Sequence, residues 1–218
     1  MLELKSLKKA YHQGSQSIEI FENLNFHVKR GERVAIMGKS GSGKSTLLSL
    51  ISGIIKPDEG DIFLNATAYK DLKESALNDF RATNIGFIFQ NFHLVSYLNA
   101  LENVMLPAKV CKVSNPKEKA IELLKSVGLG HRLDHLPSEL SGGEKQRVAI
   151  ARALIHNPKI ILADEPSGNL DEETGNAVMD ILFELIKKNN TTLILVTHSQ
   201  EVANRCEKTY ELVSGSLT

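Results

Sequence analysis

Residues 38–46 read Gly-Lys-Ser-Gly-Ser-Gly-Lys-Ser-Thr, and this stretch decides how the rest of the chain is interpreted. An apolar segment, 33–37, leads into it, and a helical pattern, 44–52, leaves it. In such a strand–loop–helix arrangement, glycines let the backbone turn its N–H groups inward, and the helix N-terminus adds partial positive charge. The pattern predicts a phosphate-binding loop (P-loop). A glycine-rich turn without function is the alternative, and the eight matching positions and their context argue against it.

The residue types within this loop have separate predicted roles. Lys44 is expected to reach the β- and γ-phosphates of a nucleotide, and the Ser45 hydroxyl is expected to ligate Mg²⁺. The other predicted nucleotide-binding positions of the loop are Gly38, Ser40, Gly41, Ser42, Gly43 and Thr46.

A second predicted part of the site is the acidic end of another apolar segment, 159–165, which reads Lys-Ile-Ile-Leu-Ala-Asp-Glu. Asp164 is expected to hold Mg²⁺ through water, and Glu165 could polarise the attacking water. Adjacent carboxylates at the end of an apolar strand are costly unless a cation neutralises them. A turn that happens to be acidic is the alternative, and it is the weaker one beside a P-loop.

The apolar segments predict an α/β fold. Four short runs are typical of strands buried on both faces of a parallel sheet, and helical patterns separate several of them. These runs are 34–37, 85–89, 160–163 and 193–196. Three segments with alternating apolar residues predict antiparallel strands beside that sheet, and they are 2–7, 18–28 and 61–64.

The middle of the chain is predicted to be helical. One helix is expected to start with Asn115 as cap, Pro116 at the first position and Glu118 reaching back to the cap, and to end at Gly128. We therefore expect a single domain, with a core formed by 1–90 and 158–218 and an inserted helical subdomain at 91–157.

Composition argues against some classes of function without excluding them. Lys plus Arg and Asp plus Glu both number 26, so no basic excess indicates nucleic acid or an anionic membrane as partner. Cys111 and Cys206 make no disulfide framework, which favours a reducing, cytosolic setting. The N-terminus lacks the apolar core of a signal peptide, and no apolar run approaches the roughly 20 residues that span a bilayer. In a membrane process, another chain would have to do the spanning.

Residues 140–147, Leu-Ser-Gly-Gly-Glu-Lys-Gln-Arg, predict a second helix N-terminus suited to an anion. Ser141 and Glu144 have the spacing of a capping box, at the start of a helix that runs to about residue 156. Gly142 and Gly143 follow the cap and expose backbone N–H groups at the positive end of the helix dipole. An ordinary capped helix would explain Ser141 and Glu144 but not the two glycines.

The stretch 140–147 resembles the signature motif of the ATP-binding-cassette (ABC) ATPases nearly letter for letter. The order of P-loop, glutamine, signature, acidic strand and histidine also fits, so the resemblance covers essentially the whole chain. It implies an ABC ATPase fold, with a P-loop core, an antiparallel β segment and an inserted helical subdomain. It also implies hydrolysis of ATP by a homodimer, in which Ser141, Gly142, Gly143 and Glu144 bind the γ-phosphate of ATP held by the other copy.

The same resemblance assigns roles to single positions. Tyr11 is similar to the aromatic residue that stacks on adenine, and His198 to the switch histidine that contacts the γ-phosphate. Gln90 is similar to the glutamine that touches Mg²⁺ and senses the membrane subunit. The predicted catalytic residues are therefore Glu165, His198, Lys44 and Gln90, and the loop 167–171 is expected to cross the dimer interface.

Residues 164–171, Asp-Glu-Pro-Ser-Gly-Asn-Leu-Asp, resemble one branch of the family. This branch contains lipoprotein-releasing, macrolide- and peptide-exporting, haem-exporting and cell-division ATPases. The segments 86–90 and 101–104 also resemble this branch. The branch implies separate transmembrane permease subunits as partners and a peripheral location at the cytoplasmic face of the inner or plasma membrane. The transported substrate is not readable, because its contacts belong to the partner chain.

The segment 91–98, Asn-Phe-His-Leu-Val-Ser-Tyr-Leu, is unusually apolar for a predicted loop. The family resemblance sets it beside a groove that receives a short cytoplasmic helix of the membrane subunit. The alternative is that Phe92, Leu94 and Leu98 pack under the helical subdomain.

Two other classes of function stay open at this point. One is a cytosolic ABC-type ATPase without a membrane partner, which serves iron–sulfur assembly or DNA repair. Repair ATPases of that type separate P-loop and signature with a long coiled coil, and the intervening 47–139 is too short for one. The other is a nucleotide kinase, which would not need the signature.

Overall fold

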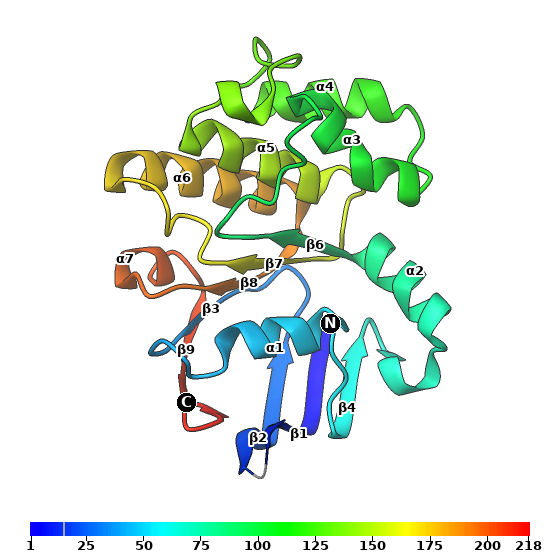
Figure 1. The fold of residues 1–218 in the computed structure, drawn as a ribbon, viewed down its shortest axis with the longest axis vertical. Helices are drawn as coiled ribbons and strands as arrows, with labels where there is room; N and C mark the ends of the chain where they lie inside the picture. Colours follow the sequence, from blue (N-terminus) through cyan, green and yellow to red (C-terminus); the bar gives the residue numbers. More distant parts are fainter. Residues whose placement is uncertain (15) are drawn as a thin grey trace. The chain divides into compact units, whose positions relative to one another are not determined.

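The computed structural model describes residues 1–14 and 16–218, and within them the chain forms two compact units (Figure 1). The first unit consists of 1–81 and 192–218, and the second of 82–191. The predicted division into 1–90 with 158–218 and 91–157 follows different boundaries, and it stays a prediction.

An antiparallel sheet forms the N-terminal part of the first unit. Its strand order is β2-β1-β4-β5, where β1 is Leu2–Gln13, β2 is Gln16–Val28, β4 is Glu59–Leu64 and β5 is Thr67–Ala68. Leu2 and Leu4 alternate along β1 and are buried, and Leu7 is also buried after a shift in strand register between Leu4 and Leu7. The predicted antiparallel segments at 2–7, 18–28 and 61–64 all lie in these strands.

The other strands of the first unit carry the P-loop. Strand β3 (Arg33–Met37) pairs in parallel with β8 (Thr192–Val196) and with β9 (Lys208–Val213), and β10 (Ser216–Leu217) pairs antiparallel with β9. Val34, Ala35 and Ile36 are fully buried, as expected for a strand covered on both faces. The helical elements of this unit are α1 (Lys44–Ile51), the 3₁₀ helix η1 (Tyr69–Asp71), α7 (Gln200–Ala203) and the start of α2 (Glu74–Asn84).

The second unit is built around one helix. Strands β6 (Ile85–Ile88) and β7 (Ile160–Asp164) pair in parallel, and the helical elements are α3 (Ala100–Val110), α4 (Pro116–Ser126), η2 (Pro137–Glu139), α5 (Gly142–Leu154) and α6 (Glu172–Asn189). Within this unit, Figure 1 shows α3 and α4 stacked on α5 and α6, with the two strands beneath. Helix α5 contacts α3, α4, α6 and β6, so it is the central element.

The predicted start of α4 is partly wrong. Pro116 occupies the first turn, and Gly128 follows the helix with a φ of 76°, both as expected. Asn115, however, is left-handed (φ 49°, ψ 57°) and makes no capping bond through its side chain. A side-chain cap needs an extended N-cap residue, so neither Asn115 nor Glu118 closes this helix as predicted.

In the part of the chain that the structure describes, there is no helix of the length and apolar character that a membrane span requires.

Candidate nucleotide-binding and hydrolysis site

The side chain of Lys44 closes the P-loop on itself. Lys44 is the first residue of α1 and is only 8% exposed. Its Nζ donates to the carbonyl oxygens of Gly38 (2.7 Å) and Lys39 (2.9 Å). The ammonium group is therefore held across the loop. A bound phosphate can replace these two carbonyls as the hydrogen-bond partner of the ammonium group.

Two glycines of the loop are required by backbone conformation and by space. Gly38 has a φ of 154°, and a Cβ there would lie 2.7 Å from Ser42 Oγ and 2.8 Å from the Leu212 carbonyl oxygen. Gly43 has a φ of 99°, and its Cβ would lie 2.7 Å from Ile20 Cγ2. An L side chain at either position would be strained and would meet a neighbour, so the loop can take this course only with glycine.

The N-terminus of α1 is open to an anion. Its N-cap is Gly43, which has no side chain to accept the first N–H groups, and its first turn contains no acidic residue. Among the described residues, Ser42 Oγ is buried without a hydrogen-bond partner. Ser45 is exposed and Thr46 half-buried in the first turn. A helix N-terminus whose first N–H groups no side chain caps is the arrangement that binds phosphate.

Two further predicted residues belong to the same unit. Tyr11 lies on β1 with 43% of its surface exposed, and Lys9 Nζ is 5.6 Å from the centroid of its ring. His198 is exposed just after β8. The Thr197 N–H donates to the Ile36 carbonyl (3.2 Å), which fixes the end of β8 to the strand that leads into the P-loop.

In the second unit, Gln90 and Glu165 lie close together around Gly168. Asp164 is the last residue of β7, and Glu165 is left-handed with a φ of 44°. The Gly168 N–H donates to the Glu165 carbonyl (2.9 Å), which closes a tight turn after the strand. A Cβ on Gly168 would lie 2.9 Å from Gln90 Nε2 and 3.2 Å from Glu165 Oε2. Both predicted catalytic side chains therefore border the space that the missing Cβ of Gly168 leaves open.

Asn169 binds the Gln90 side chain and backbone, a contact that the sequence did not predict. Its Oδ1 accepts from Gln90 Nε2 (3.1 Å), and its Nδ2 donates to the Gln90 carbonyl (3.1 Å) and to Asn91 Oδ1 (2.8 Å). Because Nε2 is used by Asn169, the amide oxygen of Gln90 is the atom suited to a cation. Within this unit, the Gln90 amide oxygen and the Asp164 carboxylate are hard oxygen donors of the kind that Mg²⁺ takes.

The predicted capping box at the start of α5 is confirmed. Ser141 Oγ accepts from the Glu144 N–H (3.2 Å), and Glu144 Oε2 accepts from the Ser141 N–H (2.8 Å). Arg132 Nε adds an ion pair to Glu144 Oε1 at 3.1 Å. The pKa of the Glu144 carboxyl is below its ordinary value, chiefly because it accepts the Ser141 backbone N–H and then because of Ser141 Oγ and Arg132.

The two signature glycines have a packing role that the sequence did not reveal. A Cβ on Gly143 would overlap Thr174 Cγ2 on α6, and a Cβ on Gly142 would lie 3.1 Å from Leu170 Cδ2. Close approach of α6 thus requires glycine at position 143 whether or not an anion binds. Asp171 caps α6 by accepting the Thr174 N–H (2.9 Å), which holds this contact in place.

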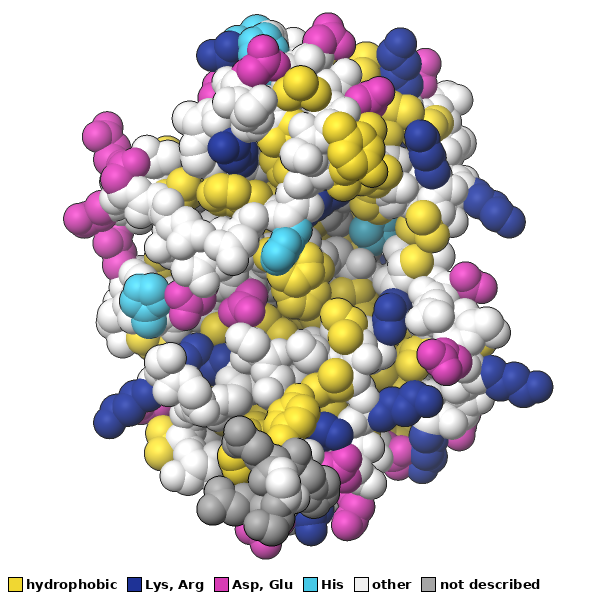
Figure 2. Space-filling view, viewed as in Figure 1, with side chains coloured by type: hydrophobic (Ala, Val, Ile, Leu, Met, Phe, Trp, Pro, Cys, Tyr) yellow, Lys and Arg dark blue, Asp and Glu magenta, His cyan; other side chains and the backbone are white. Residues whose placement is uncertain are grey.

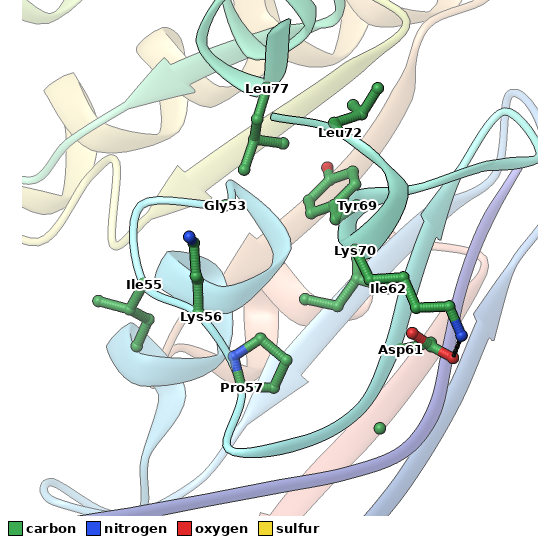
Figure 3. Close-up of a pocket in the computed structure, with 11 residues that line it drawn as sticks. Gly53, Ile55, Lys56, Pro57, Asp61, Ile62, Tyr69, Lys70, Leu72 and Leu77 are labelled. Atoms are coloured by element: carbon green, nitrogen blue, oxygen red, sulfur yellow. Dashed lines mark hydrogen bonds and ion pairs between the residues drawn. The ribbon is translucent and has the colours of Figure 1, made fainter. Parts of the chain in front are cut away.

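A separate pocket of about 230 Å³ lies in the first unit (Figure 3). The described residues that line it include no predicted site residue. Apolar side chains, among them Ile62, Tyr69 and Leu77, form its walls, and Lys70 Nζ pairs with Asp61 Oδ2 (2.6 Å) at its edge. Tyr69 donates its hydroxyl to the Ile51 carbonyl (2.9 Å). The pocket plays no part in the predicted nucleotide chemistry.

Comparison with known proteins gives one consistent result. Residues 21–168 match the protein family described as "ABC transporter". The lipoprotein-releasing system ATP-binding protein LolD of Legionella pneumophila (strain Paris) is 46% identical over 219 residues, which cover 100% of this chain and 96% of the relative. The uncharacterized ABC transporter ATP-binding protein YbbA of Escherichia coli (strain K12) is 46% identical with the same coverage.

Solved structures agree with the sequence relatives. Two dimeric structures of the cassette MJ0796, one of them described as a post-hydrolysis state bound to ADP and Pi, have a TM-score of 0.91 to this chain. Each is 42% identical and is matched over 96% of its length and 100% of this chain.

Proposed function

The chain belongs to the ABC transporter family, and from that premise we propose that it binds ATP–Mg²⁺ at residues 38–46 and hydrolyses it with Glu165 as the base. The predicted ABC ATPase fold and the predicted role as ATP-binding subunit of a transporter are confirmed by the relatives and solved structures. A cytosolic ATPase of iron–sulfur assembly or DNA repair, and a nucleotide kinase, are not favoured by them.

The observation that carries the proposal is the position of Lys44 at an open helix N-terminus. Its buried ammonium group is held by two loop carbonyls, so it is already oriented toward the loop interior. Ser42, Ser45 and the backbone N–H groups of the first turn of α1 supply further donors. Such preorganised donors stabilise the charge that develops on a transferred phosphoryl group.

The hydrolytic step would use the residues around Gly168. Glu165 is held at a tight turn, and its carboxylate accepts the proton of the attacking water, while Gln90 is positioned beside it. Ser45, Asp164 and Gln90 would hold Mg²⁺, which neutralises charge on the β- and γ-phosphates. His198 would contact the γ-phosphate, and the Tyr11 ring would stack on the adenine.

Two copies of the chain would act together. We propose that Ser141, Gly142, Gly143 and Glu144 complete the site of the other copy, so that a homodimer encloses two ATP molecules. The dimeric form of the MJ0796 structures supports this arrangement. Differential affinity of ATP for a closed and an open dimer would then drive the cycle, and hydrolysis would reset it.

The subunit would drive separate permease subunits and sit peripherally at the cytoplasmic face of the membrane. The LolD relatives support the lipoprotein-releasing branch, in which the permease, not this chain, contacts the cargo.

A groove beside the 91–98 segment is the proposed docking surface for the permease. It has a volume of about 350 Å³, and its lining includes Phe87, Phe89, Pro107 and Val110. Figure 2 shows hydrophobic side chains (yellow) in a hollow over β6, with histidine (cyan) among them. Val110 is 67% exposed, whereas Phe92, Leu94 and Leu98 are half-buried, so the packing alternative for these three has support. A short amphipathic helix of the permease would fill the apolar part.

Val110→Asp tests this docking. We expect the variant to keep the ATPase rate of the isolated subunit and to lose co-purification with the permease in detergent. Val213→Asp is the matched control, because Val213 is also exposed (49%) but lies on β9 of the first unit. Normal stimulation of a folded Val110→Asp variant by the permease would place the docking surface elsewhere.

Glu165→Gln tests the hydrolytic function. Because the amide cannot accept a proton, we expect turnover to fall about 10²–10⁴-fold while ATP affinity is retained. The variant should also stay dimeric in ATP, which light scattering measures. Phosphate release and nucleotide binding are compared with wild type, and a near-normal rate would remove Glu165 from this role.

A further inference from the structure

Arg152 is a half-buried residue of α5, and its side chain binds the backbone just beyond Gln90. Its Nη2 donates to the Phe92 carbonyl (2.6 Å) and its Nη1 to the His93 carbonyl (2.5 Å). Burial lowers the pKa of this guanidinium from its ordinary value, so the cation is desolvated. Two short, charge-assisted hydrogen bonds to carbonyls offset that desolvation, which is the geometry that a planar guanidinium favours.

The two carbonyls belong to residues in an unfavourable backbone conformation. Phe92 has a φ of 60° and His93 a φ of 46°, so two successive residues with large side chains are left-handed. Such a conformation persists only where its surroundings enforce it, and it is common at functional sites. The His93 ring packs edge-on to Phe89 at 4.7 Å, which closes the turn over itself. Arg152 is the group that bridges both strained residues.

Helix α5 also holds the chain just before Gln90. Gln146, which is fully buried, donates from Nε2 to the Phe89 carbonyl (3.4 Å). The turn from Phe89 to His93 is therefore bound at both of its ends by one helix. On its other side, Asn169 binds the Gln90 side chain and carbonyl. Gln90 sits between these two sets of contacts, beside Glu165.

We propose that Arg152 is a positioning residue for Gln90, fixing the turn from Phe89 to His93 so that the Gln90 amide stays on Asn169 and next to Glu165. This inference rests on the proposed function, because Gln90 matters to turnover only in a nucleotide hydrolase. It links α5, which begins at the signature cap Ser141, to the hydrolytic residues through direct contacts within one unit. A shift of α5 would move Gln90 with it.

A double-mutant cycle separates positioning from a merely structural role. The full-length chain is prepared as wild type, Arg152→Gln, Gln90→Ala and the double variant, and kcat, KM for ATP and the Mg²⁺ concentration for half-maximal rate are measured. We expect Arg152→Gln to lower kcat about tenfold, as for loss of one orienting group, with little change in KM. In the Gln90→Ala background the same change should lower kcat by less than twofold, because there is no longer a glutamine to position.

Two further variants control for loss of packing. Val148→Ala removes a fully buried side chain from the same helix. It should lower the melting temperature and change kcat by the same factor in both backgrounds. Arg152→Lys keeps the positive charge but loses the planar guanidinium that donates to both carbonyls. It should lower kcat less than Arg152→Gln does, and again only where Gln90 is present. If Arg152→Gln does not fold, the cycle is run with Arg152→Lys.

The possible outcomes are distinct. An equal loss of kcat from Arg152→Gln with and without Gln90, well below both melting temperatures, overturns the positioning role, and so does unchanged turnover in folded Arg152 variants. Absence of ATP hydrolysis by the wild type, alone and with its permease, would instead overturn the proposed function.

Discussion

The two glycine-rich helix starts, at α1 and at α5, look alike in sequence but are built differently. Helix α1 begins after Gly43, with no side-chain cap and no acidic residue in its first turn. Helix α5 begins after Ser141, with a reciprocal capping box and Glu144 in its first turn. At α1 the N–H groups of the first turn are left for a ligand. At α5 some of the corresponding N–H groups are bonded by the chain itself.

Charge accentuates the difference. At α1 a cation, Lys44, is folded over the loop. At α5 the first turn carries the carboxylate of Glu144, and Arg132 pairs with it. The α1 start is thus equipped to hold a polyphosphate within one chain. The α5 start presents the N–H groups of Gly142 and Gly143, which suits a second contact on a ligand held elsewhere.

The largest expected effect tests whether α1 is a binding site in its own right. Lys44→Ala removes the buried ammonium group, so we expect turnover to fall by about 10³-fold or more and ATP affinity to fall with it. Lys39→Ala is the matched control, because Lys39 is an exposed lysine of the same loop and contributes only its carbonyl to Lys44. Titration with ATP and a phosphate-release assay measure both quantities. Unchanged ATP affinity in Lys44→Ala would show that Lys44 does not make the start of α1 a phosphate site.

An intermediate effect tests whether the α5 glycines serve packing. Gly143→Ala places a methyl group against Thr174 Cγ2, so we expect a loss of about 1–3 kcal/mol in the free energy of unfolding. For a chain of this size, each kcal/mol corresponds to about 2–4 °C in melting temperature.

Thr174→Ser supplies the rescue for this variant. It removes Cγ2 but keeps the hydroxyl and the backbone N–H that Asp171 caps. Gly143→Ala combined with Thr174→Ser should therefore melt close to Thr174→Ser alone. An unrescued loss would mean that the overlap with Thr174 is not the cause.

Local features of the site could be predicted from the sequence, and long-range ones could not. The strand–loop–helix around Lys44 and the capping box of Ser141 are set by residues within a few positions of one another, so their spacing predicts them. The Asn115 cap failed, although its residue types were right, because the backbone at Asn115 is left-handed.

Contacts made across the fold have no local pattern. Gly143 meets Thr174 only because α6 packs on α5. The acceptors of Arg152 are backbone carbonyls about sixty positions away, and a carbonyl is the same for every residue type. The left-handed conformation of Phe92 is equally invisible, because phenylalanine does not favour a left-handed backbone.

The smallest expected effect concerns pH and the carboxylate that sets α5 apart from α1. The pKa of Glu144 is lowered below its ordinary value of 4.5 in the folded chain. Its ionised form therefore stabilises the fold above the unfolded pKa, and this contribution is lost as the pH falls through the lowered folded pKa. Glu144→Gln removes it. The difference in melting temperature between wild type and Glu144→Gln should then shrink as the pH is lowered from 7 to 3.5.

Arg132→Gln identifies which contact lowers the pKa. The Ser141 backbone N–H is the largest single cause and Arg132 contributes beside it, so Arg132→Gln should keep the part of the pH dependence that the Ser141 contact supplies and that Glu144→Gln loses. Thermal melts of the three proteins across this pH range measure it. The same dependence in wild type and in Glu144→Gln would mean that the capping carboxylate is not stabilised by its contacts. The start of α5 would then be closed by the Ser141 hydroxyl alone, and the distinction between the two helix starts would rest on that cap and on Lys44.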